Sequence, residues 1–300
     1  MALPLIQYSG ENMRKVVEGL LAFFVVAVFM SCASAGKSPV PSVEMEAAVV
    51  ETPKSEPKFV DIHTWKVLQA ETTYPDGVRS AIVRFTYSDK GEVLKEEQFN
   101  GNKELTAQKV YTYSGVDTVE IVSLNAGGTP LGKAVRLVDG DRINGESLYN
   151  AKGELQSSEE YTYDEKGKKT RWMVKTSSGN EISSEYTWDG ELLSAISVLD
   201  ASGAPIKRFE RTYGSDGSLS SESSFDAAGN MLGKTVYIRE NNALVREISE
   251  NSAGGVLSSI SYRNDADGNP VEISYFDRNG RLFEVKTQTW QVFTQSVQVQ

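Results

Sequence analysis

The sequence predicts an all-β protein, a repetitive antiparallel β-meander of about 17 or 18 strands that forms a long twisted or curled sheet. Glycines recur from Gly77 to Gly280, with most gaps being 11 to 14 residues and centred on 13. Runs rich in Tyr, Phe, Val, Ile and Thr fill the gaps, as expected for strands. Beyond residue 59 no apolar spacing of three and four residues persists over ten residues, so no helix is expected.

Each unit ends in a turn signal, as in "FTYSDKGEV", "YTYDEKGKK" and "YFDRNGRL". Asp, Asn and above all Gly tolerate the left-handed backbone angles that hairpin turns require. About nine residues remain between turns, enough for a strand of roughly 30 Å. Connections this short join only antiparallel neighbours. We therefore expect a turn at each repeated glycine, with Asn242 standing in for one of them.

Alternation along the strands predicts one apolar face. Val83, Phe85 and Tyr87 share one face, whereas Arg84 and Thr86 share the other. A parallel sheet covered on both sides would be apolar on both faces, so that architecture is excluded. Open sheets beyond about ten strands usually curl or split. Curling is therefore favoured over a long flat layer, because it brings the apolar face against itself.

The segments "YNAKGELQSSEEYTYDEKGKKT" and "RTYGSDGSLSSESSFDAAGNML" resemble the YD repeats of Rhs-type proteins. They are also similar to the MORN-like repeats of YwqK-type antitoxin proteins. The likeness covers about residues 74 to 287. In the Rhs family such repeats build a β-strand shell around a toxin. The resemblance implies the repeat architecture here, but this chain has too few strands for the enclosing role.

Residues 1–35 are predicted to be a signal peptide. Arg14 and Lys15 precede an apolar run, and the small residues of "SCASAGKS" follow it. The uninterrupted apolar part is shorter than the roughly 20 residues that span a bilayer. Cleavage after Ala35 suits ordinary signal peptidase. Cleavage after Ser31 suits a lipoprotein, because "FMSC" resembles a lipobox, with Phe in place of the usual Leu, and Cys32 would then carry the lipid.

Residues 36–58 contain four prolines and no sustained period, and they are predicted to be a disordered Pro/Glu-rich tether. Residues 59–300 are predicted to form the β-repeat domain. This order indicates an exported protein of the cell envelope, lipid-anchored in the periplasm or at the outer membrane. Membrane contact is expected through the N-terminal lipid alone.

Composition narrows the possible chemistry. The net charge of −10 argues against nucleic acid, since phosphate binding needs concentrated Lys and Arg. One His (His63) and one Cys predict neither a metal centre nor a cofactor site. "RNDADGNPVE" offers Asp265, Asp267 and Asn269 as a weak calcium candidate, although it matches the ordinary turn of the repeat.

Aromatic residues before the turns are the candidate binding residues. Tyr163, Trp188 and Tyr213 could stack against a sugar ring or a peptide, whereas the structural alternative is that they cover the sheet and fix its register. No catalytic residues are predicted. Glu159 and Glu160 are adjacent, so on a strand they point to opposite faces and cannot converge.

These observations predict a non-enzymatic, membrane-tethered envelope protein that offers a binding or scaffolding surface to an unidentified protein or glycan. The alternative is a periplasmic antitoxin-like or immunity-like protein that blocks a partner enzyme. An envelope hydrolase is the third possibility, and the sequence gives it the least support.

Overall fold

The computed structural model describes residues 58–299, and the signal peptide, Cys32 and nearly all of the tether lie outside them. Within this range every regular element is a β-strand. The strands are β1 (Lys58–Thr73), β2 (Arg79–Tyr87), β3 (Val93–Asn100), β4 (Leu105–Ser114), β5 (Thr118–Asn125), β6 (Pro130–Asp139), β7 (Arg142–Asn150), β8 (Leu155–Tyr163), β9 (Lys169–Thr176), β10 (Glu181–Asp189), β11 (Leu192–Asp200), β12 (Pro205–Tyr213), β13 (Leu219–Asp226), β14 (Met231–Glu240), β15 (Ala243–Asn251), β16 (Val256–Asn264), β17 (Pro270–Asp277) and β18 (Leu282–Val299).

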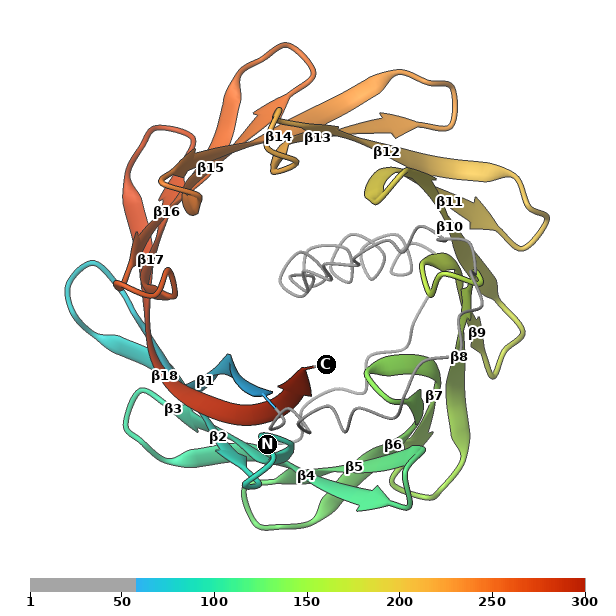
Figure 1. Cartoon of the computed structure of the whole chain (residues 1–300), viewed down its shortest axis with the longest axis vertical. Helices are drawn as coiled ribbons and strands as arrows, with labels where there is room; N and C mark the ends of the chain where they lie inside the picture. Colours follow the sequence, from blue (N-terminus) through green and yellow to red (C-terminus); the bar gives the residue numbers. More distant parts are fainter. Residues whose placement is uncertain (1–57, 300) are drawn as a thin grey trace, which may run out of the picture. The chain divides into compact units, whose positions relative to one another are not determined.

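The strands close into a barrel. Each strand pairs antiparallel with its neighbours in sequence, and β1 also pairs with β18, from Lys58 opposite Val299 to Thr73 opposite Val285. Figure 1 shows the resulting ring. The predicted antiparallel meander of 18 strands is confirmed, whereas the long twisted or curled sheet is corrected to a closed one. Closure pairs the two end strands of the meander, which would otherwise be exposed edges.

The turns follow the chemistry expected from the sequence. Most of the repeated glycines have positive φ, for example Gly153 at 81° and Gly203 at 82°. The Asn or Asp that opens such a turn caps it: the Asn150 side chain accepts hydrogen bonds from the backbone N–H groups of Lys152 and Glu154. Two turns depart from the expectation: Lys103 rather than Gly101 takes the left-handed angle, and Gly254 rather than Gly255 does so.

β-Bulges recur near the strand starts, which the repeat period did not reveal. Most neighbouring pairs shift register by one residue beside a turn: the end of β13 pairs with Gly233 and Met231 but passes over Leu232 at the start of β14, and the end of β8 likewise passes over Thr170 at the start of β9. Bulges bend a strand and increase its twist. We infer that their repetition around the ring supplies the curvature that closes the sheet.

The barrel has little conventional core. Among the described residues, Ile82 is the only large side chain that is fully buried, with 2% exposure. Most other side chains keep part of their surface accessible, and the small buried set includes serines such as Ser183 and Ser221. Stability is therefore distributed over strand pairing and cross-strand contacts around the ring. None of the described residues forms a helix long and apolar enough to cross a membrane.

Candidate binding surface on the inner face of the barrel

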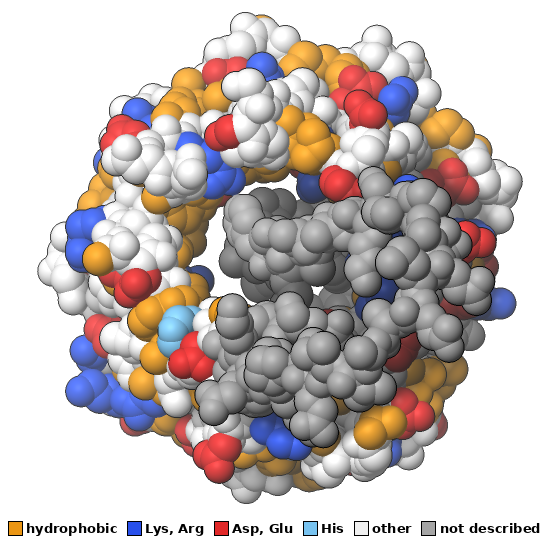
Figure 2. Space-filling view, viewed as in Figure 1, with side chains coloured by type: hydrophobic (Ala, Val, Ile, Leu, Met, Phe, Trp, Pro, Cys, Tyr) orange, Lys and Arg blue, Asp and Glu red, His pale blue; other side chains and the backbone are white. Residues whose placement is uncertain are grey.

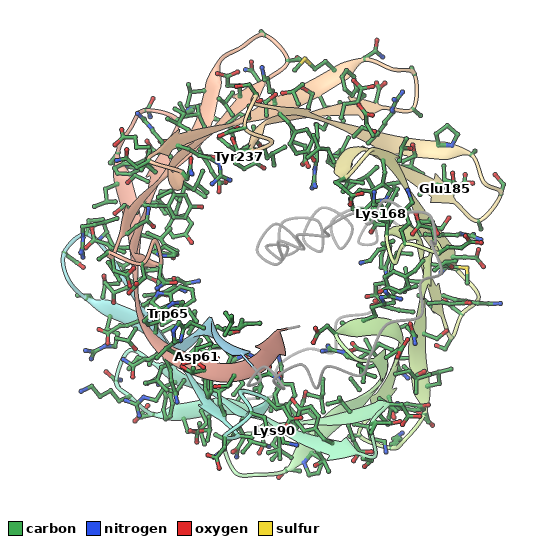
Figure 3. All side chains as sticks on the ribbon, viewed as in Figure 1. Asp61, Trp65, Lys90, Lys168, Glu185 and Tyr237 are labelled. Carbon is green, nitrogen blue, oxygen red and sulfur yellow. The ribbon has the colours of Figure 1, made fainter. Side chains whose placement is uncertain are left out.

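The two faces of the wall differ in chemistry. Figure 3 shows Tyr237 pointing into the ring and Glu185 pointing away from it. Side chains alternate along each strand, so the strand register assigns every paired residue to one face. The inner face carries most of the mid-strand rings, which are partly buried. They are Phe85, Tyr111, Tyr161, Trp172, Tyr186, Phe209, Tyr237, Tyr262 and Tyr275.

The outer face carries ion pairs in the middle of its strands. Lys95 pairs with Glu97 at 2.6 Å, and Lys133 pairs with Glu120 at 2.7 Å. Figure 2 shows charged side chains distributed around the outside of the ring. A lipid-facing barrel wall is apolar there, and a Lys or Arg at the bilayer midplane costs about 2–4 kcal/mol. The outer face of this barrel is therefore suited to water.

The three aromatic residues singled out from the sequence are fastened to the wall. The hydroxyls of Tyr163 and Tyr213 donate to the carbonyls of Ile143 and Leu193, each at 2.7 Å and 20 positions earlier. We call such contacts aromatic staples. The others are donated by Tyr87 to Val67, by Tyr113 to Val93, by Trp188 to Lys169 and by Trp290 to Pro270.

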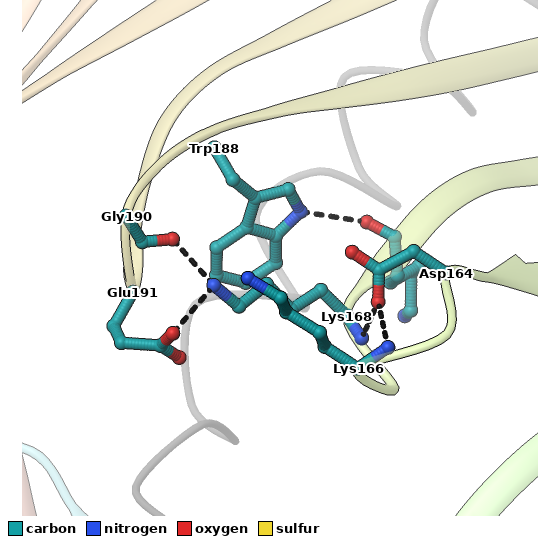
Figure 4. A network of polar contacts seen from close by, with 7 residues as sticks. Asp164, Lys166, Lys168, Trp188, Gly190 and Glu191 are labelled. Atoms are coloured by element: carbon teal, nitrogen blue, oxygen red, sulfur yellow. Dashed lines mark hydrogen bonds and ion pairs between the residues drawn. The ribbon is translucent and has the colours of Figure 1, made fainter. Parts of the chain in front are cut away.

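Trp188 is also covered on one ring face, as Figure 4 shows. Lys168 Nζ lies 5.7 Å from the Trp188 ring centroid. The same ammonium donates to the Gly190 carbonyl and pairs with Glu191 at 2.8 Å, and the Lys168 side chain is only 13% exposed. Trp188 is thus held against the wall by a hydrogen bond to the Lys169 carbonyl and by the Lys168 ammonium over its ring.

A different group of rings meets polar side chains on the inner face of β8, β9 and β10. Tyr161 and Trp172 are cross-strand neighbours. Both donate to the same carboxylate oxygen of Glu159, at 2.7 Å and 2.9 Å. Lys169 Nζ lies 4.6 Å from the Tyr161 ring centroid and 5.5 Å from that of Tyr186. We call these five residues the β8–β10 cluster.

Burial sets the proton affinities in this cluster. It raises the pKa of the Tyr161 hydroxyl, and the neighbouring Glu159 carboxylate raises it further. Burial likewise raises the pKa of Tyr186. Burial lowers the pKa of the Lys169 ammonium, against the attraction of Glu159. At neutral pH the cluster therefore presents two neutral phenols, which keeps their hydroxyls able to donate hydrogen bonds.

A second cluster of the same kind lies across β14 to β16. Tyr237 is opposite Glu247, and Tyr262 donates to Glu247 Oε1 at 2.6 Å. Burial raises the pKa of the Glu247 carboxyl. Burial, with the Glu247 interaction added, also raises the pKa of Tyr262. Ring and carboxylate thus recur together on the inner face.

Ion pairs complete this inner surface. Arg136 Nε contacts Glu146 Oε2 at 2.7 Å, and Arg211 Nε contacts Glu222 Oε2 at 2.8 Å. Beside the first pair is a hollow of about 550 Å³, whose lining includes Lys109, Tyr111, Ile121, Arg136, Glu146 and Leu148. The inner face therefore combines aromatic rings with charged hydrogen-bonding groups of both signs.

The remaining candidates from the sequence are not brought together. Asp265 Oδ1 accepts the backbone N–H groups of Asp267 and Asn269, which is the capping seen in the other turns. His63 Nδ1 lies 2.9 Å from Thr294 Oγ1. Within residues 58–299 no three His, Cys, Asp or Glu side chains are grouped as metal ligands would be. Glu159 and Glu160 do point to opposite faces, as their partners in β9 show.

Sequence reasoning missed the inner clusters because their members come from different strands. It singled out the aromatic residues before the turns. Tyr262, one of these, does meet a carboxylate, whereas Tyr161 lies two residues before the Tyr163 that was singled out. The aromatic residues beside the turns do repeat, but at about twice the assumed period of 13 residues. Tyr163, Trp188 and Tyr213 are each 25 residues apart, which is one hairpin rather than one strand.

Comparisons with known proteins add little to this description. A scan against protein-family models finds no match, and neither does a search of curated proteins. Two solved structures are titled porin-like proteins, from Bacteroides uniformis and Bacteroides vulgatus. They are 11% and 12% identical, with TM-scores of 0.42 and 0.38, and each match covers 75% of this chain and 98% of the other.

A third match is the structure titled TcdB2-TccC3-Cdc42, at 13% identity and a TM-score of 0.14. It covers 69% of this chain and 16% of the other. With TM-scores below 0.5, these likenesses assign neither a function nor a location to the chain.

Proposed function

We propose that this chain is a non-enzymatic, membrane-tethered protein of the bacterial cell envelope, whose barrel binds a glycan along its inner face. The contrast between the two faces carries the proposal. The outer face bears mid-strand ion pairs such as Lys95–Glu97, which suit water. The inner face bears the rings and carboxylates that a polar ligand with flat apolar faces requires.

The β8–β10 cluster is the best-defined part of this surface. Sugar rings present an apolar face with hydroxyls around its edge, so they are recognised by aromatic stacking combined with charged hydrogen-bonding groups. Tyr161 and Trp172 lie side by side, and Glu159 and Lys169 supply an acceptor and a donor beside them. Similar groups recur at Tyr237, Glu247 and Tyr262. A repeating ligand such as a polysaccharide fits a repeating surface.

The non-enzymatic part of the proposal rests on the distribution of the ionisable groups. Catalysis usually needs unlike groups that converge, with one pKa tuned to the reaction. Glu146 and Glu159 are neighbours on the inner face, but each is held by its own partner, Arg136 in one case and Tyr161 with Trp172 in the other. This arrangement orients both carboxylates rather than aiming them at a common point.

The test is a binding titration of the full-length protein, using soluble glycan strands released from peptidoglycan and a neutral dextran for comparison. We expect saturable binding to the former, weakened about two- to twelvefold by Trp172→Ala, because an aromatic contact contributes about 0.5–1.5 kcal/mol and 1.4 kcal/mol is a factor of ten. Tyr74→Ala, at an exposed turn, is the control. Lack of binding to peptidoglycan strands would refute the glycan proposal, and hydrolysis of those strands would refute the non-enzymatic one.

A further inference from the structure

One part of the barrel extends beyond its neighbours. β1 pairs with β2 only from Gln69 to Thr73, and β17 pairs with β18 only as far as Thr287. Residues 58–67 and 290–299 nevertheless continue to pair with each other. We call this two-stranded segment the terminal ribbon. Among residues 58–299 no third strand pairs with it, and Figure 1 shows β18 curving inward from the ring.

The ribbon is held at its base and exposed at its tip. Near the base, the Phe293 ring lies 5.3 Å from that of Tyr87, and Lys66 Nζ donates to the Gly91 carbonyl at 2.7 Å. Toward the tip, Val60 and Ile62 are 51% and 50% exposed. A two-stranded ribbon is only marginally stable in water unless a further strand or surface covers it. The tip is therefore a candidate for association.

The two edges of the ribbon differ in charge. The β1 edge contains Asp61 and Lys66. Natural proteins protect free edges in this way, because charged side chains disfavour the addition of another strand. The β18 edge has no such protection: residues 287–297 contain no charged residue, no proline and no glycine. Strand addition is therefore favoured at β18 and disfavoured at β1.

We propose that the β18 edge pairs with the β18 edge of a second copy of this chain, antiparallel about a two-fold axis. A two-fold contact uses the same surface on both copies, so it closes after one pairing. The net charge of −10 opposes association of two copies, but the neutral edge lets their backbones meet without like charges face to face. The product is a four-stranded sheet in the order β1–β18–β18′–β1′.

Such an interface is small. It consists of one strand from each copy, so it belongs with the weak or transient contacts rather than with obligate dimers. Cross-linking in cells that contain the full-length protein is therefore a better measurement than the mass of a dilute sample. Gln295 of β18 and Ile62 of β1 are directly paired, so probes at these positions compare the two edges at the same height on the ribbon.

The experiment places the photoreactive residue p-benzoylphenylalanine at position 295 or at position 62 of the full-length chain. We expect illumination to give a product of twice the chain mass from position 295, at least tenfold more than from position 62. Equal yields from the two positions, a product with a different protein only, or no product would overturn the proposal.

A charge variant provides the second test. Gln295→Lys places a positive charge on the β18 edge, at an exposed position that is paired with the uncharged Ile62. With the probe moved to position 296, we expect at least a tenfold loss of the product of twice the chain mass at an unchanged melting temperature. A product that persists at full yield in this variant would overturn the pairing through β18.

Discussion

Removal of a single hydroxyl tests whether the aromatic staples hold the barrel together. Tyr163→Phe keeps the ring but removes the group that donates to the Ile143 carbonyl at 2.7 Å. A typical hydrogen bond contributes about 0.5–1.5 kcal/mol to stability. For a domain of this size, 1 kcal/mol corresponds to roughly 2–4 °C in melting temperature. We therefore expect a decrease of about 1–6 °C.

Combining three substitutions makes the test sharper. Tyr87, Tyr163 and Tyr213 belong to separate hairpins, so replacing all three by Phe should give nearly additive losses, about 2–4 kcal/mol in total. The assay is thermal unfolding followed by circular dichroism at pH 7. Tyr74→Phe, at the exposed turn between β1 and β2, is the matched control. A triple variant that melts with the control would show that the staples contribute nothing.

Three further predictions concern the turns and the buried ionisable groups. Gly128 has φ of 80° and Gly127 does not have positive φ, so Gly128→Ala should cost about 1–2 kcal/mol in chemical denaturation while Gly127→Ala should be nearly neutral. The pKa of Glu247 is raised by burial, so its contribution to stability is full below about pH 4 and is lost as pH rises through the raised pKa. The melting temperature of Glu247→Gln should therefore improve relative to wild type between pH 4 and pH 7, and a constant difference would contradict this reasoning. Burial raises the pKa of Tyr111 to about 12, so the stability that this phenol contributes below about pH 10 is lost as pH rises toward that value. Absorbance at 295 nm should show a set of tyrosines that ionise only as circular dichroism reports unfolding, whereas ionisation complete before unfolding would oppose the assignment.

The strand repeat was predictable because turn chemistry is local. An Asp or Asn with a Gly three residues later forms a hairpin turn without reference to the rest of the chain. The meander and most turn positions were therefore predictable from residues such as Asp200 and Gly203. Closure was not predictable in the same way. It depends on the pairing of β1 with β18, more than 200 residues apart in sequence, and on a curvature to which we infer that one-residue bulges contribute.

The candidate binding surface was predictable only in part. The sequence predicted that each strand has one apolar face and favoured curling that brings this face against itself, but it did not predict that the sheet closes into a barrel. The β8–β10 cluster depends on register: Glu159 meets Trp172 because β8 and β9 pair with Tyr161 opposite Trp172. Shifting that pairing by one residue would send Trp172 to the other face. The bulges that set this register cannot be recognised from the 13-residue spacing of the turn glycines.

The outer face leads to a prediction about how the protein is held at the membrane. Mid-strand ion pairs such as Lys133–Glu120 and Arg263–Glu272 face outward, and burying several of these in hydrocarbon would cost more than the fold could supply. We therefore expect the proposed membrane attachment to come from the N-terminal region, where Cys32 is the predicted lipid carrier. Cys32→Ser should leave the strand content unchanged by circular dichroism and move the protein from the membrane fraction into the soluble fraction without detergent. If the variant stays in the membrane fraction and needs detergent for extraction, the wall itself contacts lipid, and assigning the outer face to water is wrong.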